Sequence, residues 1–149
     1  IMAGLVGSEM CIRDSYQPEA NFTYAIASNL GWYLDISDNE WPFGLKNSGI
    51  NESDLKKAFK KNFLVLLGKS DVSRKPNTAY AKENLEYILN QGEHRLARGK
   101  NFFQNAQNKA TELDIIINLD LMVVPTKDGH GNTKQMVPYA ASILKERLK

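Results

Sequence analysis

Two side chains in the sequence, Asp71 and His130, could together perform proton-transfer chemistry. A neutral imidazole can take a proton from a serine hydroxyl and later return it. A buried carboxylate on the other ring nitrogen fixes the tautomer and stabilises the imidazolium that forms. The pattern therefore predicts a catalytic pair, with His130 as the base and Asp71 as its orienter. The alternative is that both are ordinary loop residues, with His130 exposed between its flanking glycines and Asp71 capping a turn.

A serine nucleophile for this pair is not apparent. The Gly-x-Ser-x-Gly motif of a nucleophile elbow does not occur in the sequence. Ser70 comes nearest because it follows a predicted strand, but Val72 stands where glycine would allow close packing against a helix. We therefore expect the nucleophile and the oxyanion hole to lie upstream of this chain, and the chain alone to be inactive. His94, the other histidine, is expected to be structural, bonding a helix end or a neighbouring loop.

The elements that must hold Asp71 and His130 alternate between strands and helices. Three runs predict strands. They are an aromatic and β-branched run at residues 22–28, a continuous apolar run at 63–67 and an alternating apolar run at 114–125. Apolar residues at helical spacing predict helices over residues 51–61, begun by Asn51 or Ser53, and over 78–90, 93–113 and 133–149. Parallel strands need such crossovers, so the predicted class is α/β, a parallel sheet with helices on both faces. Working residues collect beyond the carboxyl ends of such strands, and Asp71 and His130 each follow one.

An irregular segment follows the first predicted strand, and we interpret residues 29–61 as lid-like. Long segments of this kind in a compact domain are often lids or pocket walls. Its aromatic side chains could line an acyl or leaving-group pocket. The candidate substrate-binding residues are Trp32, Tyr33, Trp41 and Phe43. A packed surface loop is the alternative that the sequence leaves open.

The composition is that of one globular domain, with 149 residues, 42% hydrophobic and 24% charged residues, and a formal net charge of +2. So small a charge does not build the field that nucleic-acid binding needs, and we expect no nucleic-acid partner. No apolar run approaches the roughly 18 residues of a membrane span. The sequence has one cysteine, no His-Glu-x-x-His motif, and no complete glycine-rich loop for binding a dinucleotide or a nucleoside triphosphate. We therefore expect no metal and no other cofactor. The compartment and the oligomeric state remain open.

Residues 1–15 resemble the peptide that results when sequencing-adapter DNA is translated at the end of an assembled read. On this interpretation the natural sequence begins near Tyr16 and continues from an upstream part. Residues 16–149 would then be a partial domain. The alternative is a genuine N-terminal arm.

Four stretches of the chain resemble bacterial α/β-hydrolases of the esterase or depolymerase type. They are residues 25–33, 66–71, 91–103 with the core His-Arg-Leu-Ala-Arg-Gly, and 124–136 with Gly129-His130. In order, they correspond to the sixth strand, the seventh strand with the acid, the connecting helices, and the eighth strand with the histidine. The resemblance implies that the chain is the C-terminal half of an α/β-hydrolase fold.

The resemblance also implies a function. The whole protein would be a serine hydrolase acting on a carboxylic ester or related acyl bond, in a small-molecule or polymeric substrate, with Asp71 and His130 in its triad. The order of aspartate before histidine agrees with this family. The alternative is a non-catalytic α/β interaction domain. Geometry separates the two, because the catalytic pair needs a carboxylate oxygen near hydrogen-bond distance of a ring nitrogen.

Overall fold

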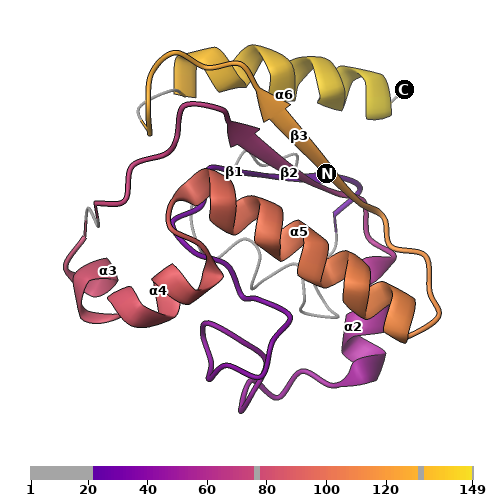
Figure 1. The fold of residues 1–149 in the computed structure, drawn as a ribbon. Helices are drawn as coiled ribbons and strands as arrows, with labels where there is room; N and C mark the ends of the chain where they lie inside the picture. The colour runs from indigo at the N-terminus through magenta and orange to yellow at the C-terminus, as the bar shows by residue number, and fades with distance from the viewer. Residues whose placement is uncertain (1–21, 76–77, 131–132, 149) are drawn as a thin grey trace.

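Three parallel strands form a sheet with helices on both faces, as the sequence predicts (Figure 1). The computed structural model describes residues 22–75, 78–130 and 133–148. The strands are β1 (Ala25–Ser28), β2 (Phe63–Gly68) and β3 (Leu119–Val124), in the order β1-β2-β3. The helices in the described part are α2 (Glu52–Phe59), α3 (Ala79–Glu83), α4 (Leu85–Gln91), α5 (Arg95–Glu112) and α6 (Thr133–Arg147). Residues 1–15, which resemble translated sequencing-adapter DNA, lie outside the described residues.

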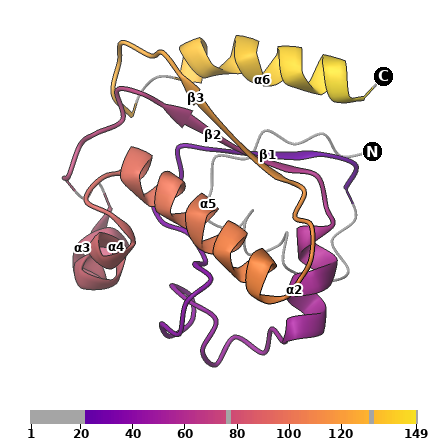
Figure 2. The same cartoon turned by 45° about the vertical axis from the view of Figure 1, so that its right-hand side comes forward.

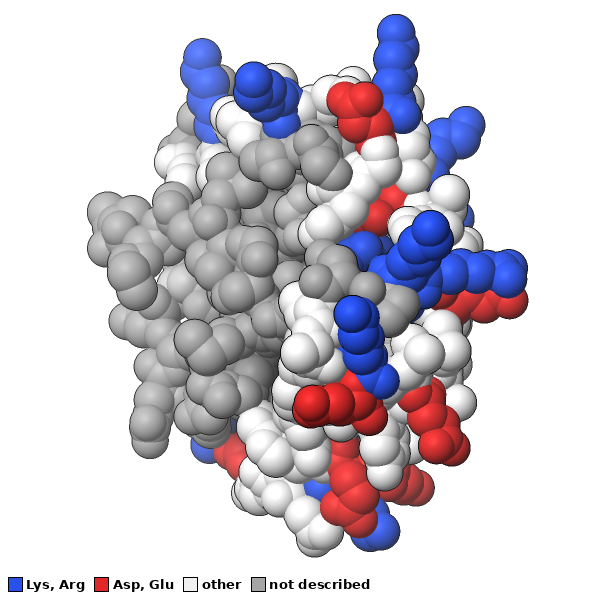
Figure 3. All heavy atoms as spheres, turned by 90° about the vertical axis from the view of Figure 1, so that its left-hand side faces the viewer, with Lys and Arg blue, Asp and Glu red and all other residues white. Residues whose placement is uncertain are grey.

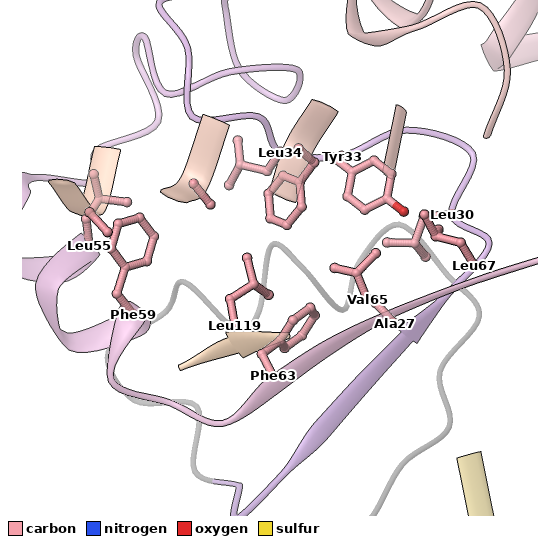
Figure 4. Close-up of a cluster of buried hydrophobic side chains, with 13 residues drawn as sticks. Ala27, Leu30, Tyr33, Leu34, Leu55, Phe59, Phe63, Val65, Leu67 and Leu119 are labelled. Atoms are coloured by element: carbon pink, nitrogen blue, oxygen red, sulfur yellow. The ribbon is translucent and has the colours of Figure 1, made fainter. Parts of the chain in front are cut away.

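The central strand β2 is buried at every position, which explains its continuous apolar sequence. Side chains alternate between the two faces of a strand, and β2 follows this rule. Phe63, Val65 and Leu67 enter the core on the face covered by α2 and α5 (Figure 4). Leu64 and Leu66 pack on the opposite face against α6, which lies along that side in Figures 1 and 2. The predicted strand, covered on both faces, is confirmed.

Two helices begin where the sequence predicts. Asn51 caps α2, because its side chain accepts from the Asp54 N–H while the Asp54 carboxylate accepts from the Asn51 N–H. The Asn51 cap confirms one of the two predicted starting points. His94 caps α5, with its Nδ1 3.1 Å from the Ala97 nitrogen. This contact confirms the helix-end role predicted for His94.

Three predicted elements differ from the structure. The strand expected over residues 22–28 is paired only over Ala25–Ser28. The helix expected over residues 78–90 is split at Asn84, whose backbone is not helical and whose side chain donates to the Tyr80 carbonyl oxygen at 2.9 Å. The strand expected over residues 114–125 is paired only from Leu119 onward. Before that point, Ile115 and Ile117 pack against the core while the Asn118 N–H donates to the Phe59 carbonyl oxygen at 2.7 Å. The alternating apolar residues there reflect core packing without strand pairing.

The segment interpreted as lid-like, residues 29–61, packs against the hydrophobic core. Leu30, Tyr33 and Leu34 belong to the main hydrophobic cluster, which Leu55 and Phe59 of α2 complete (Figure 4). Polar contacts add to this packing. The Asn105 side chain of α5 donates to both oxygens of the buried Asp35 carboxylate, at 2.9 and 3.0 Å. Burial nevertheless raises the pKa of Asp35, although the Asn105 hydrogen bonds oppose the shift.

The close approach of α5 to β2 depends on Gly99. A Cβ atom there would lie 2.5 Å from a terminal carbon of Leu67 and 2.7 Å from the Tyr33 hydroxyl oxygen. Both neighbours are fully enclosed, with relative exposures of 0% for Leu67 and 1% for Tyr33, so neither can move aside at low cost. Glycine at this position therefore sets the distance between the helix and the sheet.

We expect Gly99→Ala to lower the free energy of unfolding by about 1 to 2 kcal/mol, because overpacking outweighs the gain in helix propensity. Chemical denaturation monitored by circular dichroism measures the change. Lys100→Ala, an exposed change on the same helix, serves as the control and should stay within about 0.5 kcal/mol of the parent. A Gly99→Ala variant at least as stable as the parent would refute the close packing.

Candidate active site

The carboxyl ends of the three strands are tied together at one rim of the sheet. Gly68 at the end of β2 is in register with Val124 at the end of β3. The Lys69 N–H donates to the Val124 carbonyl oxygen at 2.9 Å, which extends the pairing into the loops. At the end of β1, Asn29 adopts a positive φ of 48° and its side-chain oxygen accepts from the Gly68 N–H at 2.8 Å. The loops after β2 and β3 therefore start side by side.

This rim brings Asp71 and His130 together. His130 Nδ1 lies 3.2 Å from Asp71 Oδ2. Asp71 has no exposed surface, whereas the side chain of His130 is 46% exposed. When its proton is on Nδ1, the imidazole donates to the carboxylate and keeps the Nε2 lone pair. The pair can thus bind a proton at Nε2 while the buried carboxylate stabilises the charge that appears on the ring.

Backbone contacts hold Asp71 in this position. Its N–H donates to the Gly68 carbonyl oxygen at 3.1 Å, and its carbonyl oxygen accepts from the Leu96 N–H at 3.2 Å. The second contact joins the loop after β2 to the first turn of α5. Asp71 is therefore fixed by the end of its own strand and by the start of the helix that crosses beneath the sheet.

Two buried arginines, Arg95 and Arg98, lie behind Asp71 together with the buried Tyr33, and the sequence analysis did not predict the arginines as site residues. Arg95 Nη1 is 3.8 Å from Asp71 Oδ1, and Arg98 Nη1 donates to the Gly92 carbonyl oxygen at 3.0 Å. Burial, and secondarily the charge of Arg95, lowers the pKa of Arg98 to about 10. Burial raises the pKa of the Tyr33 hydroxyl far above its usual value, so this group stays neutral.

A sequence signal for the arginines did exist. Arg95 and Arg98 stand in the first turn of α5, which has no acidic residue. Cations are disfavoured at a helix N-terminus, because the backbone dipole is positive there. Two arginines at the unfavourable end of a predicted helix indicate an anion nearby, although not which one.

The hydroxyl of Ser70, the nearest candidate nucleophile, is engaged elsewhere. It donates in a short hydrogen bond to the Thr126 carbonyl oxygen, and the Ser70 N–H donates to Thr126 Oγ1 at 3.2 Å. These bonds join the loop after β2 to the loop after β3. In this structure Ser70 acts as a structural link between the two loops.

The four aromatic residues predicted to line a pocket are not all accessible. Tyr33 is 1% exposed and stacks on Phe102 with ring centroids 4.8 Å apart, and Phe43 is 3% exposed. Trp32 and Trp41 are partly exposed. Trp32 contacts Tyr80 with ring centroids 5.2 Å apart. Tyr33 and Phe43 thus fill the interior, which leaves Trp32 and Trp41 as the two candidates with accessible surface.

Hydrogen bonds from α4 hold Tyr33 in the interior. The buried Gln91 side chain accepts from the Tyr33 N–H at 2.8 Å and donates to the Tyr33 carbonyl oxygen at 2.6 Å. It also donates to the Phe43 carbonyl oxygen at 3.2 Å. One glutamine therefore satisfies the backbone at two points of the irregular segment, as buried polar groups require.

The described residues contain no group of three or more His, Cys, Asp or Glu side chains placed to hold a metal ion. Of the helices in the described part of the chain, none is both long and apolar enough to cross a bilayer. Figure 3 shows the side of the molecule toward which β2 runs. On this side the described residues carry basic and acidic side chains close to one another.

No protein-family model matches the chain, and no curated protein matches it. Two solved structures are similar to it over 89% of its length. Poly(aspartic acid) hydrolase-1 from Sphingomonas sp. KT-1 has a TM-score of 0.74 and 29% sequence identity. LpqC, a poly(3-hydroxybutyrate) depolymerase from Bordetella parapertussis, has a TM-score of 0.73 and 26% identity.

The chain spans 48% and 44% of the length of these two proteins, so it corresponds to about half of each. The similarity confirms the predicted fold class, which is part of an α/β-hydrolase fold with parallel strands and helices on both faces. The fold of the chain is therefore hydrolase-like.

We expect Asp71→Asn to lower the free energy of unfolding by about 3 to 5 kcal/mol, because it leaves the buried Arg95 guanidinium without its carboxylate. Asp120→Asn is the matched control. Asp120 also pairs with an arginine, Arg147 at 3.5 Å, but both side chains are more than half exposed, so the cost should be at most about 1 kcal/mol. Urea denaturation of both variants measures the difference. If Asp71→Asn and Asp120→Asn lower the free energy of unfolding by equal, small amounts, the buried pair of Asp71 and Arg95 does not stabilise the fold more than an exposed pair does.

Proposed function

We propose that a protein containing this chain hydrolyses a carboxylic ester or related acyl bond through a serine nucleophile. His130 is the general base and Asp71 is its orienter. The observation that carries the proposal is the 3.2 Å contact between His130 Nδ1 and the fully buried Asp71 carboxylate, at the rim where β2 and β3 end. The likeness to two hydrolases supports it.

The geometry suggests how each group acts. His130 Nε2 takes the proton of the serine hydroxyl as the oxygen attacks the acyl carbon, and the resulting imidazolium is stabilised by Asp71. His130 then returns the proton to the leaving group, and a water molecule repeats the sequence to release the acid. Asp71 accepts the hydrogen bond of the His130 Nδ1–H in this scheme, and its buried position holds the imidazole in one tautomer.

The serine of this proposal comes from outside the 149 residues. The sequence has no Gly-x-Ser-x-Gly motif, and Ser70 is hydrogen-bonded to Thr126. The coverage of the two similar structures leaves room for such a part, since the chain corresponds to about half of each. The oxyanion hole would lie there too, because it uses the N–H that follows the nucleophile.

The substrate class we propose is a small-molecule or polymeric ester. Two of the similar structures are described as a poly(aspartic acid) hydrolase and a poly(3-hydroxybutyrate) depolymerase, and both names indicate that the substrate is a polymer. The side chain of His130 is 46% exposed in this chain, so the imidazole has free surface for a serine and a substrate from outside the 149 residues. Of the four aromatic residues predicted to bind substrate, Trp32 and Trp41 are the ones we retain in that role, because Tyr33 and Phe43 are enclosed.

In the longer protein that contains this chain, we expect His130→Ala and Asp71→Asn each to lower kcat for an ester by about 10⁴-fold, because either change removes proton transfer or its orientation. Steady-state hydrolysis of a p-nitrophenyl ester measures the effect. His94→Ala is the control, since this second histidine caps α5 and should leave kcat within about threefold of the parent despite losing roughly 1 kcal/mol of stability. Unchanged kcat in His130→Ala would favour a non-catalytic interaction domain.

The chain of 149 residues alone should show no ester hydrolysis and no covalent labelling by a fluorophosphonate, since it lacks an activated serine. Mass spectrometry of the intact, folded chain after incubation with the probe tests this. A fluorophosphonate adduct at Ser70 would contradict the expectation and make Ser70 the nucleophile. Heat-unfolded chain controls for non-specific labelling.

A further inference from the structure

The two oxygens of the Asp71 carboxylate face two different groups. Oδ2 lies 3.2 Å from His130 Nδ1, and Oδ1 lies 3.8 Å from Arg95 Nη1. Arg95 is 5% exposed and Asp71 is 0% exposed, so water screens their attraction little. The carboxylate is therefore held between an imidazole on one side and a buried cation on the other.

A buried carboxylate stays ionised only where nearby charges and donors offset its lost hydration. While the imidazole of His130 is neutral, it contributes a hydrogen bond and no net charge. Arg95 supplies a full positive charge, and Arg98 on the same helix adds a more distant attraction to Asp71. The Tyr33 hydroxyl, which also faces this cluster, remains neutral because burial raises its pKa.

The position of Arg95 is unfavourable for the helix that carries it. It is the first residue of α5, where the helix dipole opposes a cation, and no acidic residue stands in that turn. The Leu96 N–H, one residue later, donates to the Asp71 carbonyl oxygen at 3.2 Å, which docks the helix start onto Asp71. The ion pair with the Asp71 carboxylate offsets the cost of a cation at this end.

We propose that Arg95 is a positioning residue, which holds one oxygen of the Asp71 carboxylate by its charge and so directs the other oxygen at the imidazole of His130. Its importance for catalysis rests on the proposed function. The electrostatic role itself does not, because it requires only the contacts within this chain. Arg95 touches neither substrate nor nucleophile in this scheme and acts entirely through Asp71.

NMR of the His130 Nδ1 proton in the folded chain tests the proposal, because that proton exchanges slowly with water only while the Asp71 carboxylate holds it. Arg95→Met should speed its exchange by about tenfold or more, and Arg95→Lys, which keeps the charge, should stay near the parent. Arg74→Met is the control, since Arg74 pairs with Glu93 at the exposed surface and should leave the exchange rate unchanged. An unchanged exchange rate in Arg95→Met, or an equal rise in Arg95→Lys, would overturn the proposal.

A second variant keeps the test decisive if Arg95→Met does not fold. Arg95→Gln keeps a polar side chain but removes the charge, so it should speed the exchange of the His130 Nδ1 proton in the same way. An exchange rate in Arg95→Gln equal to that of the parent would overturn the proposal. These measurements need no nucleophile. If they give the expected result while the longer protein fails to hydrolyse esters, the proposed function fails and the ion-pair role stands.

Discussion

The parallel pairing of β2 with β3 is the constraint on which the candidate site depends. Parallel strands in register end at the same level, and here Gly68 is paired with Val124. The loops that follow carry Asp71 and His130, so the register places the carboxylate and the imidazole within reach. A slip of one residue would also turn the side chains of β2 to the wrong faces, exchanging the layers packed on α5 and α6.

The burial of Asp71 turns this proximity into defined electrostatics. A solvated carboxylate would interact weakly with an imidazole, because water screens the charge. With no exposed surface, Asp71 is little screened by water from the imidazole and the arginine beside it. The same burial makes the site dependent on the start of α5, which supplies Arg95 and the Leu96 N–H. Gly99, one turn further along, lets that helix approach closely enough to cover the sheet.

The residues around the site divide into those that meet solvent and those that hold the framework. The imidazole of His130 reaches solvent, while the carboxylate and both arginines are enclosed. Gln91 and Asn29 use buried side chains to satisfy backbone groups of neighbouring loops. These polar side chains around the site therefore hold loops in place, as a preorganised site requires.

Local patterns in the sequence determined the positions of β2, α2, α5 and α6, because hydrophobic periodicity and capping residues act over a few neighbouring positions. They also indicated that Asp71 and His130 follow strands that end at one rim. Only the tertiary structure decided that Tyr33 and Phe43 fill the interior, that β3 begins at Leu119, and that Arg95 faces Asp71. These outcomes depend on contacts between residues far apart in the chain. A local pattern can indicate that an anion lies near the start of α5, but not which residue supplies it.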